Sequence, residues 1–579
     1  MTMLTKWGAV LDREHPLPEY PRPQLRRESF YNLNGVWDYA VTPSGDEPEV
    51  WDGEIVVPFS PEAPLSGAAR GPAKDEYLHY RRGFTLPEGF QKSRVLLHFG
   101  AVDQIAEVFV NGISAAKHSG GYWPFSADIT SLLREGENIL RVTVRDNADD
   151  PTFAYGKQRY KRGGMWYTAQ SGIWQTVWLE SVPEVYVKSL RITPEFDEAR
   201  VHIELETALE SSAAITCDVR AADGSFVAGS WAKGGVCVVP LPGFRAWTPD
   251  DPYLYTLDIT CGEDRVESYF AMRKFSYVEL GGRKVFGLNN APLFHNGLLD
   301  QGYYPDGLLT PPSDEAMVND IETMKRCGFN MLRKHIKIEP LRWYYHCDRL
   351  GMIVWQDMVS GGQPYSFLHV SALPTLGKVD LPDKDAKPYG RSGVLSRARF
   401  RREMADTVRL LYNCPCIALW TVFNEGWGQF DALDMANELK KLDPTRFIDH
   451  ASGWQDQGYE EMKSRHIYFR PVKLKNDGRA LALTEYGGYI LAVDGHRWTD
   501  KVFGYRICRD SAALAHDYEK LMLGQVLPHI RKEGLTAAVY TQITDVEEEL
   551  NGLMTYDREV LKIPEETLRE INAALRFDA

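Results

Sequence analysis

Short apolar and β-branched runs recur through the first 183 residues of the chain. The runs at residues 94–99, 105–110 and 139–145 each have the length of a strand, and Asn111-Gly112 is a dipeptide typical of a hairpin turn. Strands at this spacing predict a β-sandwich of the jelly-roll kind over residues 1–183. The run SGIWQTVWLE, residues 171–180, is predicted to be its last strand.

A second β segment is predicted at residues 184–276. Apolar and polar positions alternate at residues 201–205 and 255–260, as in strands with one buried face. A loop rich in Pro, Gly and Trp, residues 240–252, separates these strands. The segment has the size of one immunoglobulin-like β-sandwich.

From about residue 285 short apolar strands alternate with amphipathic helices. Ser313 can cap a helix whose Met317, Ile321 and Met324 fall on one face, and Gly328 supplies its stop. Further helices are predicted at residues 340–350 and 397–412. Strands are predicted near residues 293–296, 329–333, 352–356, 417–423, 447–449, 466–469, 481–484 and 537–542. Eight strands that alternate with helices predict an α/β domain, a (β/α)8 TIM barrel, over residues 277–579.

Composition narrows the class of partner. The chain has 579 residues, which is too long for one core, and its formal charge of −14 disfavours nucleic acid and anionic membranes. The sequence contains no stretch that reads as a signal peptide or a membrane helix, so we expect a cytoplasmic protein. Whether copies assemble into a homo-oligomer is left open. The eight cysteines are interpreted as buried reduced thiols, including the close pair Cys414 and Cys416.

Two glutamates stand directly after buried strands of the predicted barrel. The apolar run CIALWTVF leads into Asn424-Glu425, and LALT leads into Glu485. Residues just past the strand ends of such a barrel face its active site. Hydrolysis of a glycoside with retention needs two carboxyl groups about 5 to 5.5 Å apart. We therefore interpret Glu425 and Glu485 as a catalytic pair.

These motifs resemble glycoside hydrolase family 2, which contains β-galactosidases, β-glucuronidases and β-mannosidases. The resemblance rests on Phe423-Asn424-Glu425-Gly426, Thr484-Glu485-Tyr486-Gly487-Gly488, Trp355-Gln356-Asp357-Met358 and the order of the three domains. It covers nearly the whole chain and implies the three-domain form of the family. It also implies that Glu425 is the acid/base and Glu485 the nucleophile of a retaining exo-β-glycosidase.

The resemblance further implies a set of residues that bind the sugar. The candidates are Asn424 for the 2-hydroxyl, Tyr468 against the nucleophile, His335, Asp300, Trp454, Trp427, Gln542 and Asp357. His335 has an alternative interpretation as a core histidine. Trp427 and Trp454 could instead be ordinary packing residues. Asp357 could instead orient a neighbouring side chain. No metal and no cofactor is implied.

Departures from the family bear on the substrate, a small-molecule or oligosaccharide β-glycoside. Gly488 and Gln542 stand where β-galactosidases carry a histidine and a tryptophan, which puts galactose in doubt. The Asn-x-Lys pair that reads glucuronic acid in β-glucuronidases is not evident near the acidic run at residues 545–549. The working hypothesis is a β-galactosidase-like enzyme acting on a neutral hexose. The alternatives are β-glucuronidase, β-mannosidase, β-glucosidase or α-L-arabinosidase activity.

Three alternatives remain open at this stage. A carbohydrate-binding protein without catalysis would use a degenerate barrel of the same kind, and a transglycosidase would use the same glutamates. The basic run at residues 157–162, Lys-Gln-Arg-Tyr-Lys-Arg, is interpreted first as a solvated surface loop. The alternative is a loop that overhangs the barrel mouth and meets an anionic or extended aglycone.

Overall fold

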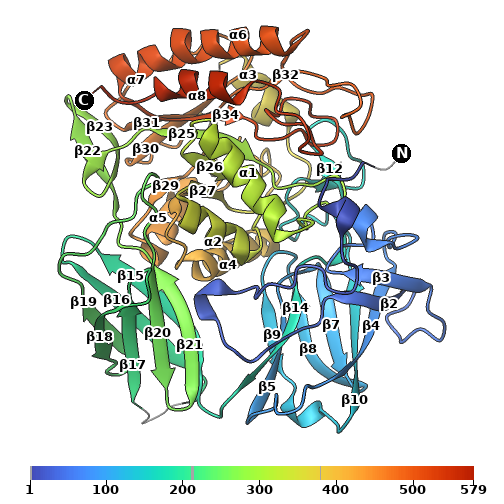
Figure 1. Ribbon diagram of the computed structural model, residues 1–579. Helices are drawn as coiled ribbons and strands as arrows, with labels where there is room; N and C mark the ends of the chain where they lie inside the picture. Colours follow the sequence, from blue (N-terminus) through green and yellow to red (C-terminus); the bar gives the residue numbers. More distant parts are fainter. Residues whose placement is uncertain (1–2, 210–213, 378–379, 579) are drawn as a thin grey trace.

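The computed structural model describes residues 3–209, 214–377 and 380–578. In Figure 1 two β-sandwiches lie side by side beneath a helix-covered barrel, with the N-terminal sandwich in blue and the second sandwich in green. This confirms the predicted fold class of two sandwiches and a C-terminal barrel.

The N-terminal sandwich is built from two antiparallel sheets. One has the order β3-β2-β4-β10-β7-β8 and the other the order β1-β14-β5-β9. Their strands are β1 (Phe30–Asn32), β2 (Gly35–Thr42), β3 (Gly53–Val57), β4 (Tyr77–Thr85), β5 (Arg94–Phe99), β7 (Ile105–Val110), β8 (Ile113–Ser119), β9 (Phe125–Asp128), β10 (Glu137–Arg145) and β14 (Val177–Val182). Alternate side chains of both sheets face inward and form one apolar core, which contains Trp37, Tyr80 and Val142.

The run predicted as one last strand is interrupted. Gly172 and Ile173 form the short strand β13 against β6 (Val102–Asp103), and β14 begins only at Val177. Between them the buried ring of Trp174 donates from Nε1 to the carbonyl of Gly121 at 2.7 Å. This bond and the left-handed φ of Gly172, +77°, break the ladder.

The second sandwich packs a three-stranded sheet, β15-β16-β19, on a four-stranded sheet, β18-β17-β20-β21. The strands are β15 (Val187–Glu195), β16 (Arg200–Thr207), β17 (Ile215–Arg220), β18 (Phe226–Trp231), β19 (Val236–Pro240), β20 (Tyr255–Cys261) and β21 (Asp264–Phe270). Buried and more exposed positions alternate along β16 and β20, as predicted from the sequence.

The barrel is a sheet of eight parallel strands in the order β29-β28-β27-β26-β25-β34-β31-β30. They are β25 (His295–Asp300), β26 (Met331–Lys334), β27 (Ile353–Asp357), β28 (Ile417–Thr421), β29 (Phe447–Asp449), β30 (Met462–Ile467), β31 (Ala480–Gly487) and β34 (Leu535–Thr541). Between β29 and β30 the gap is bridged by Ser464 Oγ, which donates to Asp449 Oδ1 at 2.9 Å.

Helices cover the barrel, but not after every strand. They are α1 (Asp314–Arg326), α2 (Leu341–Leu350), α4 (Val394–Leu411), α5 (Ala432–Leu442), α6 (Ser511–Leu521), α7 (Leu527–Glu533) and α8 (Glu565–Ala573). Ser313 caps α1 as predicted, because its Oγ accepts from Ala316 N at 3.2 Å. The prediction of strict alternation was wrong for two connections: residues 450–461 and 468–479, all of them described, run from strand to strand without a helix.

A small three-stranded sheet closes the barrel at the N-terminal end of its strands. Strands β22 (Phe275–Leu280), β23 (Arg283–Leu288) and β24 (Ala291–Pro292) pack on the first residues of the barrel strands. Phe286 stacks on Phe447 with ring centroids 4.3 Å apart. This end of the barrel is filled with apolar side chains. A polar active site is therefore expected at the opposite end, where the C-termini of the strands lie.

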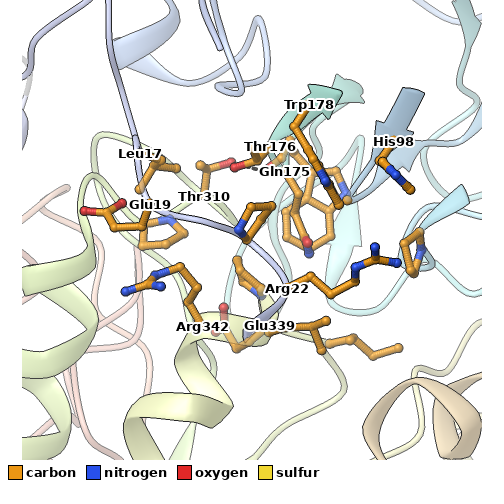
Figure 2. Close-up of a pocket in the computed structure, with 18 of the residues that line it drawn as sticks. Leu17, Glu19, Arg22, His98, Gln175, Thr176, Trp178, Thr310, Glu339 and Arg342 are labelled. Atoms are coloured by element: carbon orange, nitrogen blue, oxygen red, sulfur yellow. Dashed lines mark hydrogen bonds between the residues drawn. The ribbon is translucent and has the colours of Figure 1, made fainter. Parts of the chain in front are cut away.

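The N-terminal segment, residues 3–29, joins all three domains. Thr5 donates to Asp306 Oδ2 of the barrel at 2.7 Å. Arg27 donates to Glu180 of the first sandwich at 3.0 Å and to Asp264 of the second at 2.9 Å. A junction cavity of about 230 Å³ lies where this segment meets the first sandwich and the barrel. In Figure 2, Leu17 and Glu19 lie at one end of it and His98 at the other, with Arg22 between them and nearer to His98.

Two further features concern the chain as a whole. Among the described residues, no helix combines the length and the apolar character that crossing a bilayer requires. All eight cysteines are buried and free, including Cys414 and Cys416.

Replacement of Arg27 tests the junction. Arg27→Leu leaves the buried carboxylate of Asp264 without its guanidinium, and we expect it to lower the free energy of unfolding by about 3 kcal/mol. Arg26→Leu is the matched control, because its partner Glu267 is half exposed and the pair contributes less than about 1 kcal/mol. Urea titration followed by tryptophan fluorescence measures both. Equal losses for the two variants would contradict the role given to Arg27.

Candidate active site

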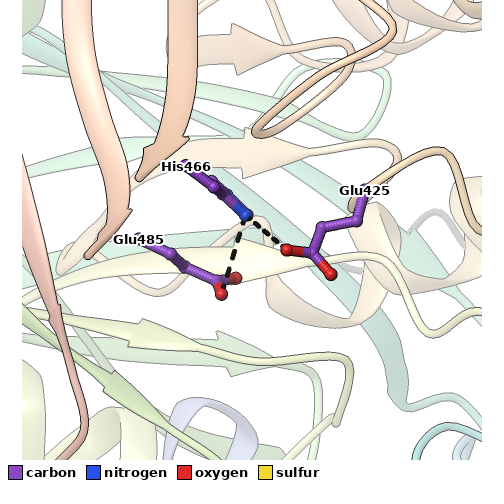
Figure 3. Close-up of side chains that lie close together, drawn as sticks. All are labelled: Glu425, His466 and Glu485. Carbon is purple, nitrogen blue, oxygen red and sulfur yellow. Dashed lines mark hydrogen bonds and ion pairs between the residues drawn. The ribbon is translucent and has the colours of Figure 1, made fainter. Parts of the chain in front are cut away.

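The two predicted catalytic glutamates meet at the mouth of the barrel. Glu425 follows β28, and Glu485 lies near the end of β31. One carboxylate oxygen of each, together with Nδ1 of His466, falls within a group whose atoms all lie within 4.8 Å of one another. Figure 3 shows the three side chains converging from separate strand ends. The sequence separation of the two glutamates is therefore bridged by the barrel, as predicted.

His466, at the end of β30, lies between the glutamates and was missed from the sequence. Its Nδ1 is 2.8 Å from Glu425 Oε1 and 3.6 Å from Glu485 Oε2, and the side chain is fully buried. A signal for it existed, because His466 is two residues before Tyr468, and alternate residues of an extended segment share a face. Among the described residues, Glu425, His466 and Glu485 are the one set of three such side chains close enough to hold a metal ion.

Arg333, on β26, is the second residue that sequence reasoning missed. Its guanidinium is fully buried and donates to both oxygens of Asp357 at 3.0 Å, to Glu485 Oε1 at 3.0 Å and to Asn424 Oδ1 at 2.8 Å. Arg333 lies two residues before His335, a predicted site residue, so the alternation of side chains along an extended segment could have indicated it too. Asn424 is thereby oriented so that its Nδ2 remains a donor for a ligand.

The environment of Glu485 favours its ionised form. Burial by itself raises the pKa of a carboxyl group, but the positive charges of His466 and Arg333 and a hydrogen bond from Tyr468 outweigh it and lower the pKa of Glu485 to about 2. Tyr468 Oη donates to Glu485 Oε2, and its ring stacks on Tyr505 with centroids 3.9 Å apart. Glu485 is therefore a carboxylate at any pH near neutrality.

Asp357 and His335 form a pair beside this centre. His335 Nδ1 is 2.7 Å from Asp357 Oδ2, which leaves Nε2 for a ligand. Burial and the charge of Lys157 lower the pKa of His335. Although burial opposes it, the charge of Arg333 lowers the pKa of Asp357 to about 2. Asp357 thus orients Arg333 and His335, as its alternative interpretation held.

The remaining predicted residues occupy different places. Trp454 Nε1 donates to the carbonyl of Glu425 at 2.9 Å, and its ring lies 5.5 Å from His466. Trp427 packs edge to face on Trp166 of the first sandwich at 5.1 Å. Gln542 is buried and donates to Asn551 Oδ1 at 2.8 Å. Asp300 pairs with Lys334 at 2.7 Å within a separate cluster of charges that includes Glu339.

A cavity of about 720 Å³ opens beside Glu425. Trp454, His466 and Tyr468 form its inner wall, and Phe367, Leu376 and Phe469 lie farther out. Each of these three outer side chains is at least 70% exposed, so the rim is apolar and open to solvent. The cavity has the size and lining of a ligand site.

A segment of the first sandwich, residues 153–170, crosses the barrel mouth; we call it the mouth segment. Tyr155 N donates to the carbonyl of Ser360 at 3.1 Å, and Thr168 N donates to Glu547 Oε1 at 2.8 Å. Tyr167 Oη donates to Glu549. The basic run lies in this segment, so its interpretation as a solvated loop was wrong for Lys157 and Gln158, which are both buried.

The backbone of Glu425 is unusual. Its φ is +54° and that of the next residue, Gly426, is +73°, so two left-handed residues follow each other at the end of β28. Glu425 N donates to the carbonyl of Ser452 at 2.9 Å, and Trp427 N donates to the carbonyl of Asn424 at 2.9 Å. These bonds hold the turn that carries the carboxylate into the mouth.

A parallel barrel that brings paired carboxylates and aromatic rings together at its C-terminal mouth defines the class of glycoside hydrolases. Family models agree. Residues 64–183 match the sugar binding domain of glycosyl hydrolases family 2, residues 185–273 match glycosyl hydrolases family 2, and residues 311–474 match the TIM barrel domain of that family. The chain belongs to glycosyl hydrolases family 2.

Relatives within the family differ in the sugar that their names give. The chain is 25% identical over 387 residues to a β-galactosidase of Thermoanaerobacter pseudethanolicus, a match that covers 63% of this chain and 47% of that protein. It is 22% identical to a β-glucuronidase of Paenibacillus borealis over 82% of this chain and 85% of that one. The chain thus spans about half the length of the curated β-galactosidase it matches.

A solved structure shows the same fold. The β-glucuronidase of an uncultured Clostridium sp. superposes with a TM-score of 0.74 at 19% identity, over 95% of this chain and 98% of that one.

The pH dependence of stability tests the electrostatics of the site. Glu485 and Asp357 have folded pKa values of about 2, below their usual values, so they stabilise the fold above about pH 5 and lose this effect as pH falls toward 2. Arg333→Met removes a cation that lowers the pKa of both carboxyl groups, alongside His466 in the case of Glu485. We expect it to lower the free energy of unfolding at pH 7 by about 3 to 5 kcal/mol and to flatten its fall between pH 5 and pH 2.

Urea titrations at a series of pH values measure this change. Arg326→Met is the control, because its pair with Glu565 lies on the surface and should leave the pH dependence unaltered. An unchanged slope in Arg333→Met would show that the guanidinium does not set these two pKa values.

Proposed function

We propose that the protein is a retaining exo-β-glycosidase that hydrolyses a terminal β-linked sugar through a covalent intermediate on Glu485. The observation that carries this proposal is the spacing of the two carboxylates, whose nearest oxygens lie within 4.8 Å. Retaining enzymes keep the two groups about 5 to 5.5 Å apart, whereas inverting enzymes need about 6.5 to 9.5 Å to admit a water molecule.

The chemistry follows from the two environments. Glu425, as the acid, donates its proton to the glycosidic oxygen while an oxygen of Glu485 attacks the anomeric carbon, so that the bond to the aglycone breaks and a glycosyl ester forms. Glu425, now a base, then takes a proton from water. That water attacks the anomeric carbon, and Glu485 leaves as a carboxylate.

The assignment of the two roles is supported by depth and charge. The Glu485 side chain is 6% exposed and ionised, as a nucleophile must be, while that of Glu425 is 22% exposed and borders the open cavity. A leaving group in that cavity would lie within reach of Glu425. The apolar rim formed by Phe367, Leu376 and Phe469 supports an aglycone with apolar surface.

The sugar is a separate question. Relatives named β-galactosidase and relatives named β-glucuronidase match this chain at similarly low identity. The neutral hexose expected from the sequence rested on the lack of a cationic motif near residues 545–549. The mouth segment supplies another source of cations, which favours an acidic sugar for the reasons given in the next subsection.

Substitution of the two glutamates tests the mechanism. Glu485→Gln should abolish turnover of 4-nitrophenyl β-glycosides, because no covalent intermediate can form. Glu425→Ala should lower kcat about 10²- to 10⁴-fold on substrates with poor leaving groups and much less on nitrophenyl substrates. Azide should restore part of its activity and yield a β-glycosyl azide. NMR of the first product formed by the wild type should show the β-anomer.

Glu438→Gln, on the surface of α5, is the control and should behave like the wild type. Azide rescue of Glu485→Gln instead of Glu425→Ala would reverse the assigned roles. Sugar binding without any release of nitrophenol by the wild type would instead identify a carbohydrate-binding protein.

A further inference from the structure

One cation of the mouth segment has no role in the mechanism described so far. Lys157 lies in the first sandwich, yet only 9% of its surface is exposed. Tyr167 N donates to its carbonyl at 3.0 Å, which anchors the backbone. The residue before it, Gly156, has φ +64°, and a Cβ there would lie 3.0 Å from the carbonyl oxygen of Ile336. The backbone just before Lys157 thus lies close to Ile336, two residues beyond the end of β26.

The ammonium group of Lys157 lacks a counterion within the described part of the chain. The protein has three other buried lysines there, and each contacts a carboxylate: Lys334 at 2.7 Å, Lys337 at 2.9 Å and Lys562 at 2.6 Å. Lys157 has no carboxylate within 4.0 Å among the described residues, and its Nζ lies 5.8 Å from the centre of the Trp166 ring. A buried charge without a partner is costly, so such a group calls for an anionic ligand.

The charge of Lys157 acts on two groups of the active site, His335 and Glu549. It contributes to the lowered pKa of His335, after burial, and it opposes the rise that burial causes in the pKa of Glu549. The charge of Glu485 acts on both of these groups as well. His335 and Glu549 therefore lie within electrostatic range of both Lys157 and the proposed nucleophile, and the bonds of Tyr167 to Glu549 and to the Lys157 carbonyl connect the same groups.

We propose that Lys157 determines specificity by pairing with a carboxylate on the terminal sugar, so that the substrates are β-linked uronic acids. This inference rests on the proposed function, because it assigns the sugar of that same site. A neutral hexose would offer Lys157 hydroxyl groups but no compensating charge. A uronic acid supplies the counterion that the described part of the fold does not.

The sequence expectation of a neutral sugar is thereby revised. It assumed that a cation for a uronic acid would come from the barrel near residues 545–549, which are acidic. In the structure the acidic run contacts the mouth segment, since Glu547 accepts from Thr168 and Glu549 from Tyr167. The cation is carried by another domain, some 390 residues earlier in the chain, and these contacts hold its segment over the mouth.

Lys157→Met tests the proposal, because it keeps an unbranched side chain, one atom shorter, and removes the charge. We expect kcat/KM on 4-nitrophenyl β-glucuronide and β-galacturonide to fall about 100-fold, mostly through KM, as expected when one partner of a buried ion pair is removed. The smaller activity on β-galactoside and β-glucoside should change less than about 3-fold. Lys157→Arg should recover part of the loss. Lys161→Met, an exposed lysine of the same segment, should match the wild type.

Calorimetric titration with free glucuronic acid, galacturonic acid and galactose gives a readout that needs no turnover. The wild type should bind the acids more tightly than galactose. Lys157→Met should lose this preference without any fall in its thermal unfolding temperature, because the substitution removes an unpaired buried charge. Equal effects of Lys157→Met on acidic and neutral glycosides would overturn this inference and leave the glycosidase standing. If the protein bound uronic acids through Lys157 but cleaved no glycoside, the inference about Lys157 would stand and the proposed glycosidase activity would be wrong.

Discussion

The guanidinium of Arg333 is the group around which the active site is arranged. It is wholly buried, and its donors are shared among Glu485, Asp357 and Asn424. A planar guanidinium can satisfy several acceptors at fixed angles, which a lysine cannot do. Its charge allows two carboxylates to remain ionised inside a barrel whose other end is filled with apolar rings. His466 and Arg333 together keep Glu485 ionised, and the hydrogen bond from Arg333 orients the side chain of Asn424.

The site is divided between two domains. The barrel supplies the carboxylates and His466, while the mouth segment of the first sandwich supplies Lys157 and a wall of aromatic side chains, among them Trp166. The relative position of the domains therefore has to be fixed closely. Direct contacts do this, because Tyr155 N donates to the carbonyl of Ser360 and Thr168 N donates to Glu547 of the barrel. The N-terminal segment adds a second link, since Thr5 donates to Asp306 of the barrel and Arg27 to Glu180 of the first sandwich.

Much of this arrangement could be predicted from the sequence, for identifiable reasons. Glu425 and Glu485 each follow a run of buried residues, and such positions face the mouth of a barrel. His466 and Arg333 could have been found by alternation from Tyr468 and His335. Lys157 could not, because its burial results from contacts with distant parts of the chain, and a basic run alone is typical of solvated loops. Helices after β29 and β30 were expected from the repeat of the fold, but their residues form loops instead.

The left-handed backbone of Glu425 has a consequence for the balance between stability and catalysis. A side chain at φ +54° is strained at a cost of about 1 kcal/mol or more, and glycine would adopt the same conformation without that strain. Glu425, the acid/base candidate, thus occupies a position where glycine would avoid the strain and make the folded state more stable. Such a conflict is typical of residues retained for reactivity.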